Sequence, residues 1–416
     1  MEPRTARQFE LTNPLPKCYN IPNQTFSQRS ACIMKFCIID GVLHAPSHPL
    51  PEGDAVFFEV ADDASRISVP QGVHTIAQKA FFRLPHLKSL SLPEGVVSLG
   101  DYAVHRCDAL TEIHLPSTLT HLGTGAFAAN RTLASLVLPD GITRLPEKCF
   151  QWCTALERVS LPKHLTHIGD SAFGVCRNLR EIDLPDTLRE IGRRSFSECK
   201  YLTKIVLPEG LTHTGTFFEC TALTDVTLPS TLTHIDPFAF YGCASLEHIP
   251  LPEGVVSLGD SAFRCCTALK EIALPDGISL IENRTFSDCT ALASVRFPAS
   301  LTHIDSTAFY ECTALKRADL PAGVVCVEEW AFNRCSSLTE VTLPEGLTSI
   351  GAQAFCDCTA LIDIRLPDSL REIGDYAFYN CTSLKGIVLP QNLSVIGEEA
   401  FFGCGTVIPT SSRNID

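Results

Sequence analysis

The chain lacks the features that mark a membrane-spanning or conventionally secreted protein. No stretch approaches about 18 consecutive apolar residues, so the sequence predicts no transmembrane helix and no membrane insertion. The first ten residues, Met1 to Glu10, include basic residues but no apolar segment of the kind that a secretory signal requires. From these absences we expect a cytoplasmic location.

The chain is also short of charge, and of positive charge in particular. Charged residues make up 19% of the sequence, below the usual quarter or so, and the net charge is −14. Binding to a nucleic-acid backbone or to an anionic lipid surface needs a basic stripe. We therefore expect neither nucleic acid nor an anionic membrane as a partner.

Motifs of catalysis and cofactor binding are missing as well. The sequence contains no G-x-S-x-G, P-loop, H-E-x-x-H or dinucleotide fingerprint, so we predict no catalytic residue, no cofactor and no metal ion. One remote alternative is a metal-dependent protein or enzyme that uses His213 and His234, which lie in adjacent repeats. Two histidines without a third ligand are a weak signal for a metal site.

What the chain does contain is one phrase repeated along most of its length. The phrase begins with an apolar residue fifteen times, and thirteen of the fourteen spacings are 23 residues while one is 21. A fixed period of this length predicts a solenoid, in which each unit buries its apolar face by stacking on its neighbours. The starts are Val69, Leu92, Leu115, Leu138, Leu161, Leu184, Leu207, Leu228, Leu251, Leu274, Phe297, Leu320, Leu343, Leu366 and Leu389.

Within one repeat, the apolar positions predict a strand and a turn. If the opening residue is position 1, apolar residues recur at positions 1, 5, 8, 13, 16, 19 and 22. The alternation at 22, 23 and 1 predicts a short strand that the proline at position 2 ends. Positions 9 to 15 suggest a short helical or 3₁₀ turn on the opposite face. Position 13 is Phe in nearly every repeat, with Val104 as the clear exception, and predicts a buried aromatic column.

The twenty cysteines point to a buried column of free thiols. Thirteen of them share position 16, and free cysteine packs well as a small apolar group. Disulfides between neighbouring repeats are possible by Cα distance, but stacked parallel side chains usually present the wrong geometry. A reduced column also fits a reducing compartment. The thirteen are Cys107, Cys153, Cys176, Cys199, Cys220, Cys243, Cys266, Cys289, Cys312, Cys335, Cys358, Cys381 and Cys404.

The repeat resembles the BspA-like, or treponemal-type, leucine-rich repeat family. Residues 343–361, LPEGLTSIGAQAFCDCTAL, are close to the family consensus. The resemblance implies an α/β leucine-rich repeat solenoid, a right-handed superhelix with a long parallel β-sheet on its concave face and short helical or 3₁₀ turns on its convex face. It implies a non-enzymatic protein–protein interaction module, like surface proteins that bind host or neighbouring-cell proteins, and hence a cell-surface or secreted location. The alternative is a cytoplasmic scaffold protein.

The repeat and its flanks predict four parts of the chain. Residues 1–30 form an irregular N-terminal arm, 31–68 an N-terminal β cap, 69–404 the solenoid and 405–416 a C-terminal tail. Within the cap, residues 36–43 predict a hairpin that turns at Asp40-Gly41, and 56–60 predict another strand.

Two irregularities lie near the middle of the chain. The repeat that starts at Leu207 has 21 residues and places polar Thr214 at position 8, and Pro250 falls inside the next predicted strand. A tolerated deletion and a hinge or ligand notch are both compatible with this pattern.

The candidate binding surface is the set of outward strand positions, 21 and 23, on the concave face. Opposite charges there often fall on neighbouring strands, which predicts a face that neutralises itself through cross-strand pairs. The alternative is a patch that binds a folded protein by charge complementarity. Aromatic anchors, which dominate many interfaces, are absent from these positions. The charges are densest at Arg296, Arg317, Asp319, Glu340, Asp363 and Arg365.

Overall fold

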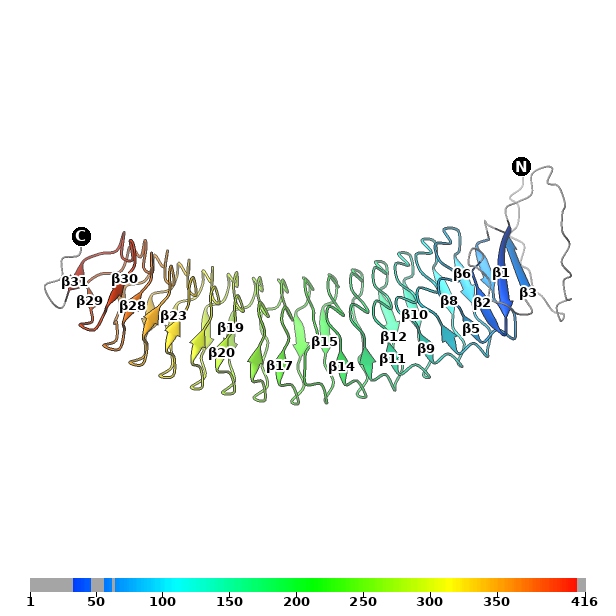
Figure 1. The fold of residues 1–416 in the computed structure, drawn as a ribbon, viewed down its shortest axis with the longest axis horizontal. Coiled ribbons are helices and arrows are strands. Elements are labelled where there is room, and N and C mark those ends of the chain that lie inside the picture. Colours follow the sequence, from blue (N-terminus) through cyan, green and yellow to red (C-terminus); the bar gives the residue numbers. More distant parts are fainter. Residues whose placement is uncertain (1–32, 46–55, 62–63, 410–416) are drawn as a thin grey trace, which may run out of the picture. The chain divides into compact units, whose positions relative to one another are not determined.

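A computed structural model describes residues 33–45, 56–61 and 64–409 of the chain. The chain divides into two compact units, residues 1–199 and 200–416. Within each unit, successive 23-residue coils follow one another in sequence order, blue to green in the first unit and green to red in the second (Figure 1). Each coil carries two short strands that pair with the equivalent strands of neighbouring coils, so each unit has two rows of parallel strands.

Row A consists of the strands predicted at positions 21 to 23. Its central residue is buried and its flanking residues are exposed in most coils, which confirms the predicted alternation. In the first unit, row A contains β4 (Arg66–Ser68), β6 (Ser89–Ser91), β8 (Glu112–His114), β10 (Ser135–Val137) and β12 (Arg158–Ser160). In the second unit it contains β15 (Lys204–Val206), β16 (Asp225–Thr227), β19 (Glu271–Ala273), β21 (Ser294–Arg296), β23 (Arg317–Asp319), β25 (Glu340–Thr342), β27 (Asp363–Ile364), β29 (Ile387–Leu389) and β31 (Val407–Pro409).

Row A is not the one long sheet that we expected. In the second unit it consists of the separate ladders β15-β16, β19-β21, β23-β25-β27 and β29-β31. The coil that contains Pro250 forms no strand at this position, because proline has no N–H to give to the ladder. At the C-terminal end, β31 pairs with β29 in parallel, so row A extends beyond residue 404.

Row B lies at positions 7 and 8, and we did not predict it from the sequence. In the first unit it contains β5 (Thr75–Ile76), β7 (Ser98–Leu99), β9 (His121–Leu122), β11 (Arg144–Leu145), β13 (His167–Ile168) and β14 (Glu190–Ile191). In the second unit it contains β17 (His234–Ile235), β18 (Ser257–Leu258), β20 (Leu280–Ile281), β22 (His303–Ile304), β24 (Cys326–Val327), β26 (Ser349–Ile350), β28 (Glu372–Ile373) and β30 (Val395–Ile396).

The prediction of helical or 3₁₀ turns at positions 9 to 15 is wrong, and with it the α/β fold class. Across the described part of the chain the structure contains no helix, so none can span a membrane. In a representative turn, Thr307 and Glu311 have left-handed φ values of 58° and 56°, which interrupt a right-handed helix. The fold is an all-β solenoid with a leucine-rich repeat sequence.

Hydrogen bonds explain why this turn is not a helix. The N–H groups of Thr307, Phe309 and Glu311 donate to carbonyls of the next coil at 2.9, 2.7 and 2.9 Å. The N–H groups between them, on Ala308 and Tyr310, donate three residues back within the turn, both at 3.2 Å. Alternate donors therefore leave the segment, whereas an α-helix would keep all of them on residues four positions earlier.

The aromatic column predicted at position 13 is confirmed. The Phe rings of consecutive coils stack nearly parallel, as between Phe309 and Phe332, whose centroids lie 5.0 Å apart at 7°. Both side chains are fully buried. The column supplies the largest buried side chains of the core, so it contributes strongly to the apolar burial that stabilises the stack.

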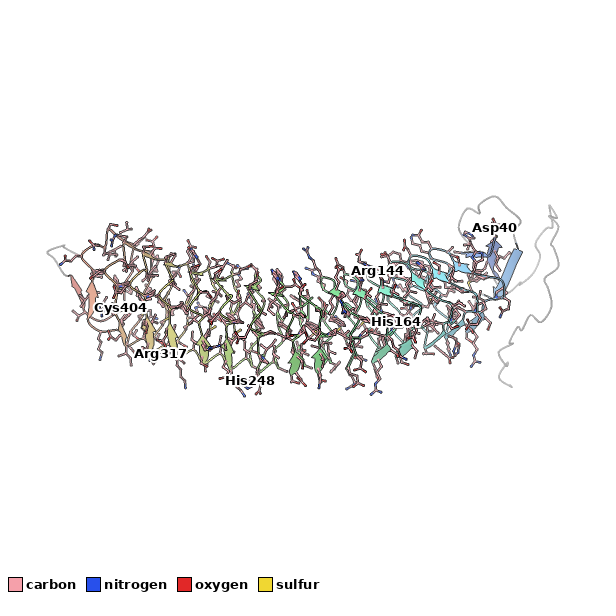
Figure 2. The ribbon with its side chains drawn as sticks, turned by 90° about the horizontal axis from the view of Figure 1, so that it is seen from below. Asp40, Arg144, His164, His248, Arg317 and Cys404 are labelled. Carbon is pink, nitrogen blue, oxygen red and sulfur yellow. The ribbon has the colours of Figure 1, made fainter. Side chains whose placement is uncertain are left out.

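The column of cysteines at position 16 is buried next to the aromatic column. Twelve of its thirteen members are buried, and the terminal Cys404 is partly exposed and labelled in Figure 2. The cysteines of the described residues are free thiols. The thiol of Cys312 donates to the carbonyl of Phe286 in the preceding coil at 3.2 Å, and most of the column repeats this contact. Burial raises the pKa of Cys312 well above its ordinary value.

One coil places an amide in the same slot. Asn130 is fully buried, its Nδ2 donates to the carbonyls of Val104 and Phe127 at 2.8 Å each, and its Oδ1 accepts the N–H of Cys107 at 2.9 Å. The Cys thiol and the Asn amide thus satisfy the same kind of carbonyl. What position 16 requires is a small buried donor.

The predicted N-terminal hairpin is confirmed. β1 (Ile33–Ile39) and β2 (Val42–His44) pair antiparallel across Asp40 and Gly41, whose positive φ values of 48° and 74° suit a tight hairpin turn. The predicted strand at 56–60 is β3 (Val56–Ala61), which pairs antiparallel with β1. β2 then pairs in parallel with β5, so the hairpin continues row B. The predicted arm, residues 1–30, lies outside the described residues, and the four-part division of the chain stays a prediction.

The 21-residue coil accommodates its deletion locally. Thr214 is buried, and its hydroxyl accepts the N–H of Asp236 at 3.0 Å. The carboxylate of Asp236 in turn accepts the N–H of Gly215 at 2.8 Å. Phe217 still stacks on Phe240 with centroids 5.7 Å apart. These contacts favour the tolerated deletion over the ligand notch.

Candidate protein-binding surface

The six candidate residues lie on or beside four row A strands of the second unit. Arg296 ends β21, Arg317 and Asp319 flank the buried residue of β23, Glu340 begins β25 and Asp363 begins β27. Arg365 follows β27, and all six side chains are exposed. Figure 2 labels Arg317 and His248, which share position 21, along one edge of this unit.

The structure joins three of the six into one network. The Arg317 guanidinium donates to Asp319 Oδ2 at 2.6 Å and to Glu340 Oε2 at 2.7 Å. Thr342 completes the network by donating to Asp319 Oδ1 at 2.8 Å. The hydrogen bond from Arg317 lowers the pKa of Asp319. Because these groups are about half exposed, the pairs add little stability and mainly orient the side chains.

The other three candidates are not joined to this network. Arg365 lies 3.6 Å from Glu345, in the adjoining loop, and is 88% exposed. Among the described residues no ion pair engages Arg296 or Asp363, and the register of β25 and β27 places Asp363 beside the like charge of Glu340. These three charged groups are therefore available to a partner.

A hollow that we did not predict lies beside two of the candidates. It has a volume of about 610 Å³, and Asp363, Arg365, Asp368, Val388 and Gln391 are among its lining residues. Gly386 also lines it and occupies position 21, where every other coil has a side chain. That missing side chain was the available sequence signal. The hollow combines charged groups with the exposed apolar Val388.

Elsewhere row A neutralises itself, as the alternative interpretation proposed. Arg158 pairs with Glu181 at 3.0 Å in the first unit, and Lys204 pairs with Asp225 at 3.3 Å in the second. Exposed pairs of this kind contribute about 0–1 kcal/mol each. Unpaired charge on row A is thus concentrated at the C-terminal end of the candidate patch.

The histidine pair does not form a metal-binding arrangement with a third group. The rings of His213 and His234 stack 4.6 Å apart at 3°. The Nδ1 atom of each lies within hydrogen-bonding distance of the preceding threonine hydroxyl, at 3.1 and 2.8 Å. Within the described residues no group of three or more His, Cys, Asp or Glu side chains is placed to hold a metal ion.

Aromatic side chains that row A lacks lie instead on the turn segments. We call the solvent-facing side of positions 9 to 15 the turn face. In the second unit this face carries Phe218, Tyr241, Tyr310, Trp330, Tyr376, Tyr379 and Phe402. We interpreted this segment from its conserved-length core pattern alone, and so missed positions 11 and 14, whose residue type varies from coil to coil.

Comparisons with known proteins agree with this architecture. A leucine-rich repeat protein from Bacteroides ovatus is 31% identical, covering 82% of this chain and 84% of its own, with a TM-score of 0.69. One from Eubacterium ventriosum is 21% identical, covering 85% and 95%, with a TM-score of 0.47. A leucine-rich cell surface protein from Faecalibacterium prausnitzii is 21% identical, covering 94% and 96%, with a TM-score of 0.44. No curated protein matches the chain.

The family comparison covers nearly the whole repeat region. The model of the BspA type leucine rich repeat region matches residues 53–150, 125–217, 213–326 and 302–414. These ranges overlap and span most of the chain. This protein therefore belongs to the BspA-type leucine-rich repeat family.

Proposed function

We propose that this protein is a non-enzymatic interaction module that binds a folded protein partner through row A of the second unit. The contact patch comprises the six exposed charged residues together with the neighbouring hollow. Charges at fixed positions on paired strands suit a folded partner, because complementary charges on that partner can meet them in one register.

The observation that carries this proposal is the unpaired charge next to the hollow. Arg296 and Arg365 project from a surface that otherwise pairs its own charges, and Val388 supplies apolar area at 51% exposure. A polar rim around an apolar depression is the usual anatomy of a protein interface. Family membership supports the same function, since the resemblance implies a protein-interaction module.

Reversing the unpaired charges tests the proposal. We expect Arg296→Glu/Arg365→Glu to weaken capture of the partner from a source-cell lysate by about tenfold or more, because like charges would then face each other across the interface. Immobilised protein and quantitative mass spectrometry measure the captured amount.

The matched control is Arg144→Glu/Lys163→Glu, which changes the net charge equally at exposed sites of the first unit. Equal losses in both double variants would mean that capture depends on net charge, and the patch would be rejected. Unchanged capture in Arg296→Glu/Arg365→Glu would reject it as well.

The compartment distinguishes the two versions of this function. Adhesion to a host or neighbouring-cell protein requires the chain on the outside of the cell, whereas a scaffold works inside. The partly exposed free thiols of Cys265 and Cys326 favour the second version, because such thiols persist in a reducing compartment.

Antibody labelling of intact and permeabilised source cells separates these versions. We expect labelling only after permeabilisation if the chain is a scaffold. Labelling of intact cells would contradict the predicted cytoplasmic location and make adhesion the leading version.

A further inference from the structure

Tyrosines at position 14 of the second unit repeatedly hold a cation. The Arg264 guanidinium lies over the ring of Tyr241, 5.7 Å from its centroid, and pairs with Asp288 at 3.2 Å. The ring and the carboxylate thus share one guanidinium. Each contact is favourable by itself, since a cation is attracted both to the face of an aromatic ring and to a negative charge.

The same arrangement recurs three coils later. The Arg334 guanidinium lies 5.9 Å from the ring centroid of Tyr310, donates to Tyr310 OH at 3.1 Å and donates to Glu311 Oε1 at 2.8 Å. Trp330 lies 6.1 Å from the Tyr310 ring and widens the aromatic surface. Two separate coils therefore use an arginine of the same chain to cover a position 14 tyrosine.

The third tyrosine at position 14 has no such arginine. Tyr379 stacks on Phe402 with centroids 5.3 Å apart and meets Tyr376 edge-on at 5.7 Å. The next coil has Phe402 and Gly403 at positions 14 and 15, where Arg264 and Arg334 lie in the earlier examples. Across the described residues no cation lies over any of these three rings, and Phe402 is 58% exposed.

Carboxylates surround this uncovered aromatic group. Asp375, Glu398 and Glu399 are exposed neighbours of Tyr376, and none of them forms an ion pair with any residue that the structure describes. The negative charge of Glu398 is the main reason why the pKa of Tyr376 is raised. The group therefore carries the aromatic and acidic halves of the earlier arrangement without its cation.

We propose that Tyr376, Tyr379 and Phe402, with Asp375, Glu398 and Glu399, form a docking site for an arginine or lysine side chain in a basic segment of a partner protein. The repeat itself supplies the template, since the two related sites show which chemistry covers a position 14 tyrosine. The proposal rests on the proposed function, because it names a second contact, on the turn face, for a protein partner. Its charge complements the negative site.

Fluorescence anisotropy with a labelled peptide of alternating arginine and glycine tests the site on the full chain. We expect the arginine peptide to bind at least about tenfold more tightly than the same peptide with neutral citrulline in place of arginine. Tyr379→Leu/Phe402→Leu removes two rings without changing any charge, and we expect it to weaken binding by about tenfold. Both side chains lie on the turn face, and thermal unfolding verifies that the variant is folded.

A pair of charge-matched variants controls for attraction to the net charge. Glu398→Gln/Glu399→Gln should weaken binding several-fold, whereas Glu157→Gln/Glu253→Gln, at exposed sites elsewhere, should leave it within about twofold. Equal effects of the two pairs, or no effect of Tyr379→Leu/Phe402→Leu, would overturn the proposal. Failure of the arginine peptide to bind at about 1 mM would also overturn it.

The chain's own Arg413, which follows the described residues, is the competing occupant. Binding that appears only in Arg413→Ala would show that the chain fills its own site, and would overturn the assignment to a partner. Arg296→Glu/Arg365→Glu should bind the arginine peptide normally. Loss of peptide binding thus reports on the turn face, and loss of partner capture in that variant reports on row A.

Discussion

Raising the pH from 8 to 10 is expected to destabilise the fold steeply. Burial raises the pKa of ten thiols in the position 16 column, to about 12 for Cys107 and for Cys153. In the unfolded chain these thiols would ionise near pH 8.5–9. The other eight whose pKa is raised are Cys176, Cys243, Cys266, Cys289, Cys312, Cys335, Cys358 and Cys381.

The sign follows from proton binding. Below about pH 8.5 both states keep these protons, so the thiols favour neither. Above it the unfolded chain releases them while the folded chain holds them, so the free energy of unfolding falls by about 1.4 kcal/mol per thiol per pH unit. Summed over ten thiols, one pH unit removes about 14 kcal/mol, which is comparable with the stability of a whole domain.

Urea midpoints at pH 7, 8, 9 and 10 measure this effect. A variant with Cys→Ala substitutions at Cys289, Cys312 and Cys335 should show a shallower fall, because it has three fewer thiols to ionise. If wild type and variant lose stability in parallel between pH 8.5 and 10, the column is not the cause.

Truncation of one ring in the aromatic column should also be severe. Phe309 is fully buried between Phe286 and Phe332, with centroids at 5.3 and 5.0 Å, and meets Phe297 edge-on at 5.7 Å. We expect Phe309→Ala to lower the free energy of unfolding by about 3–5 kcal/mol, since it leaves a cavity that the two coils cannot close.

Denaturant titration followed by circular dichroism measures this loss. The matched control is Phe402→Ala, which removes the same side chain from an exposed site and should cost less than about 1 kcal/mol. A cost below about 1 kcal/mol for Phe309→Ala would contradict the role of the column in the core.

The sequence predicted those features that recur in every coil and depend on burial. Phe at position 13 and Cys at position 16 each fill a column, and an apolar or small residue that returns every 23 residues must face its own copies. The hairpin at Asp40-Gly41 was predictable too, because few sequences suit two consecutive positive φ values.

Row B and the form of the turn could not be read from the same pattern. A strand of two residues, such as His303–Ile304, is too short to show an alternation of period two. Left-handed residues such as Thr307 and Glu311 carry no glycine signal, because hydrogen bonds to the next coil impose their conformation. The helical interpretation failed because these bonds connect residues 22 positions apart.

The candidate site was predictable only in part. Charges at positions 21 and 23 identified the patch, and the pairing of Arg317 with Glu340 followed from their adjacent strands. The hollow beside Asp363 depends on an absent side chain at Gly386. The uncovered Tyr379 depends on the absence of an arginine one coil later. Both are differences between coils, which a consensus pattern averages away.

The alternating hydrogen bonds of the turns give the stack a direction. Each turn donates through Thr307, Phe309 and Glu311, or their equivalents, to the carbonyls of the coil that follows. Every coil is therefore an acceptor on one side and a donor on the other. Removing or duplicating a whole 23-residue coil joins a donor side to an acceptor side and restores every bond, so chain length in this protein can change by gene duplication or loss without redesign of the core.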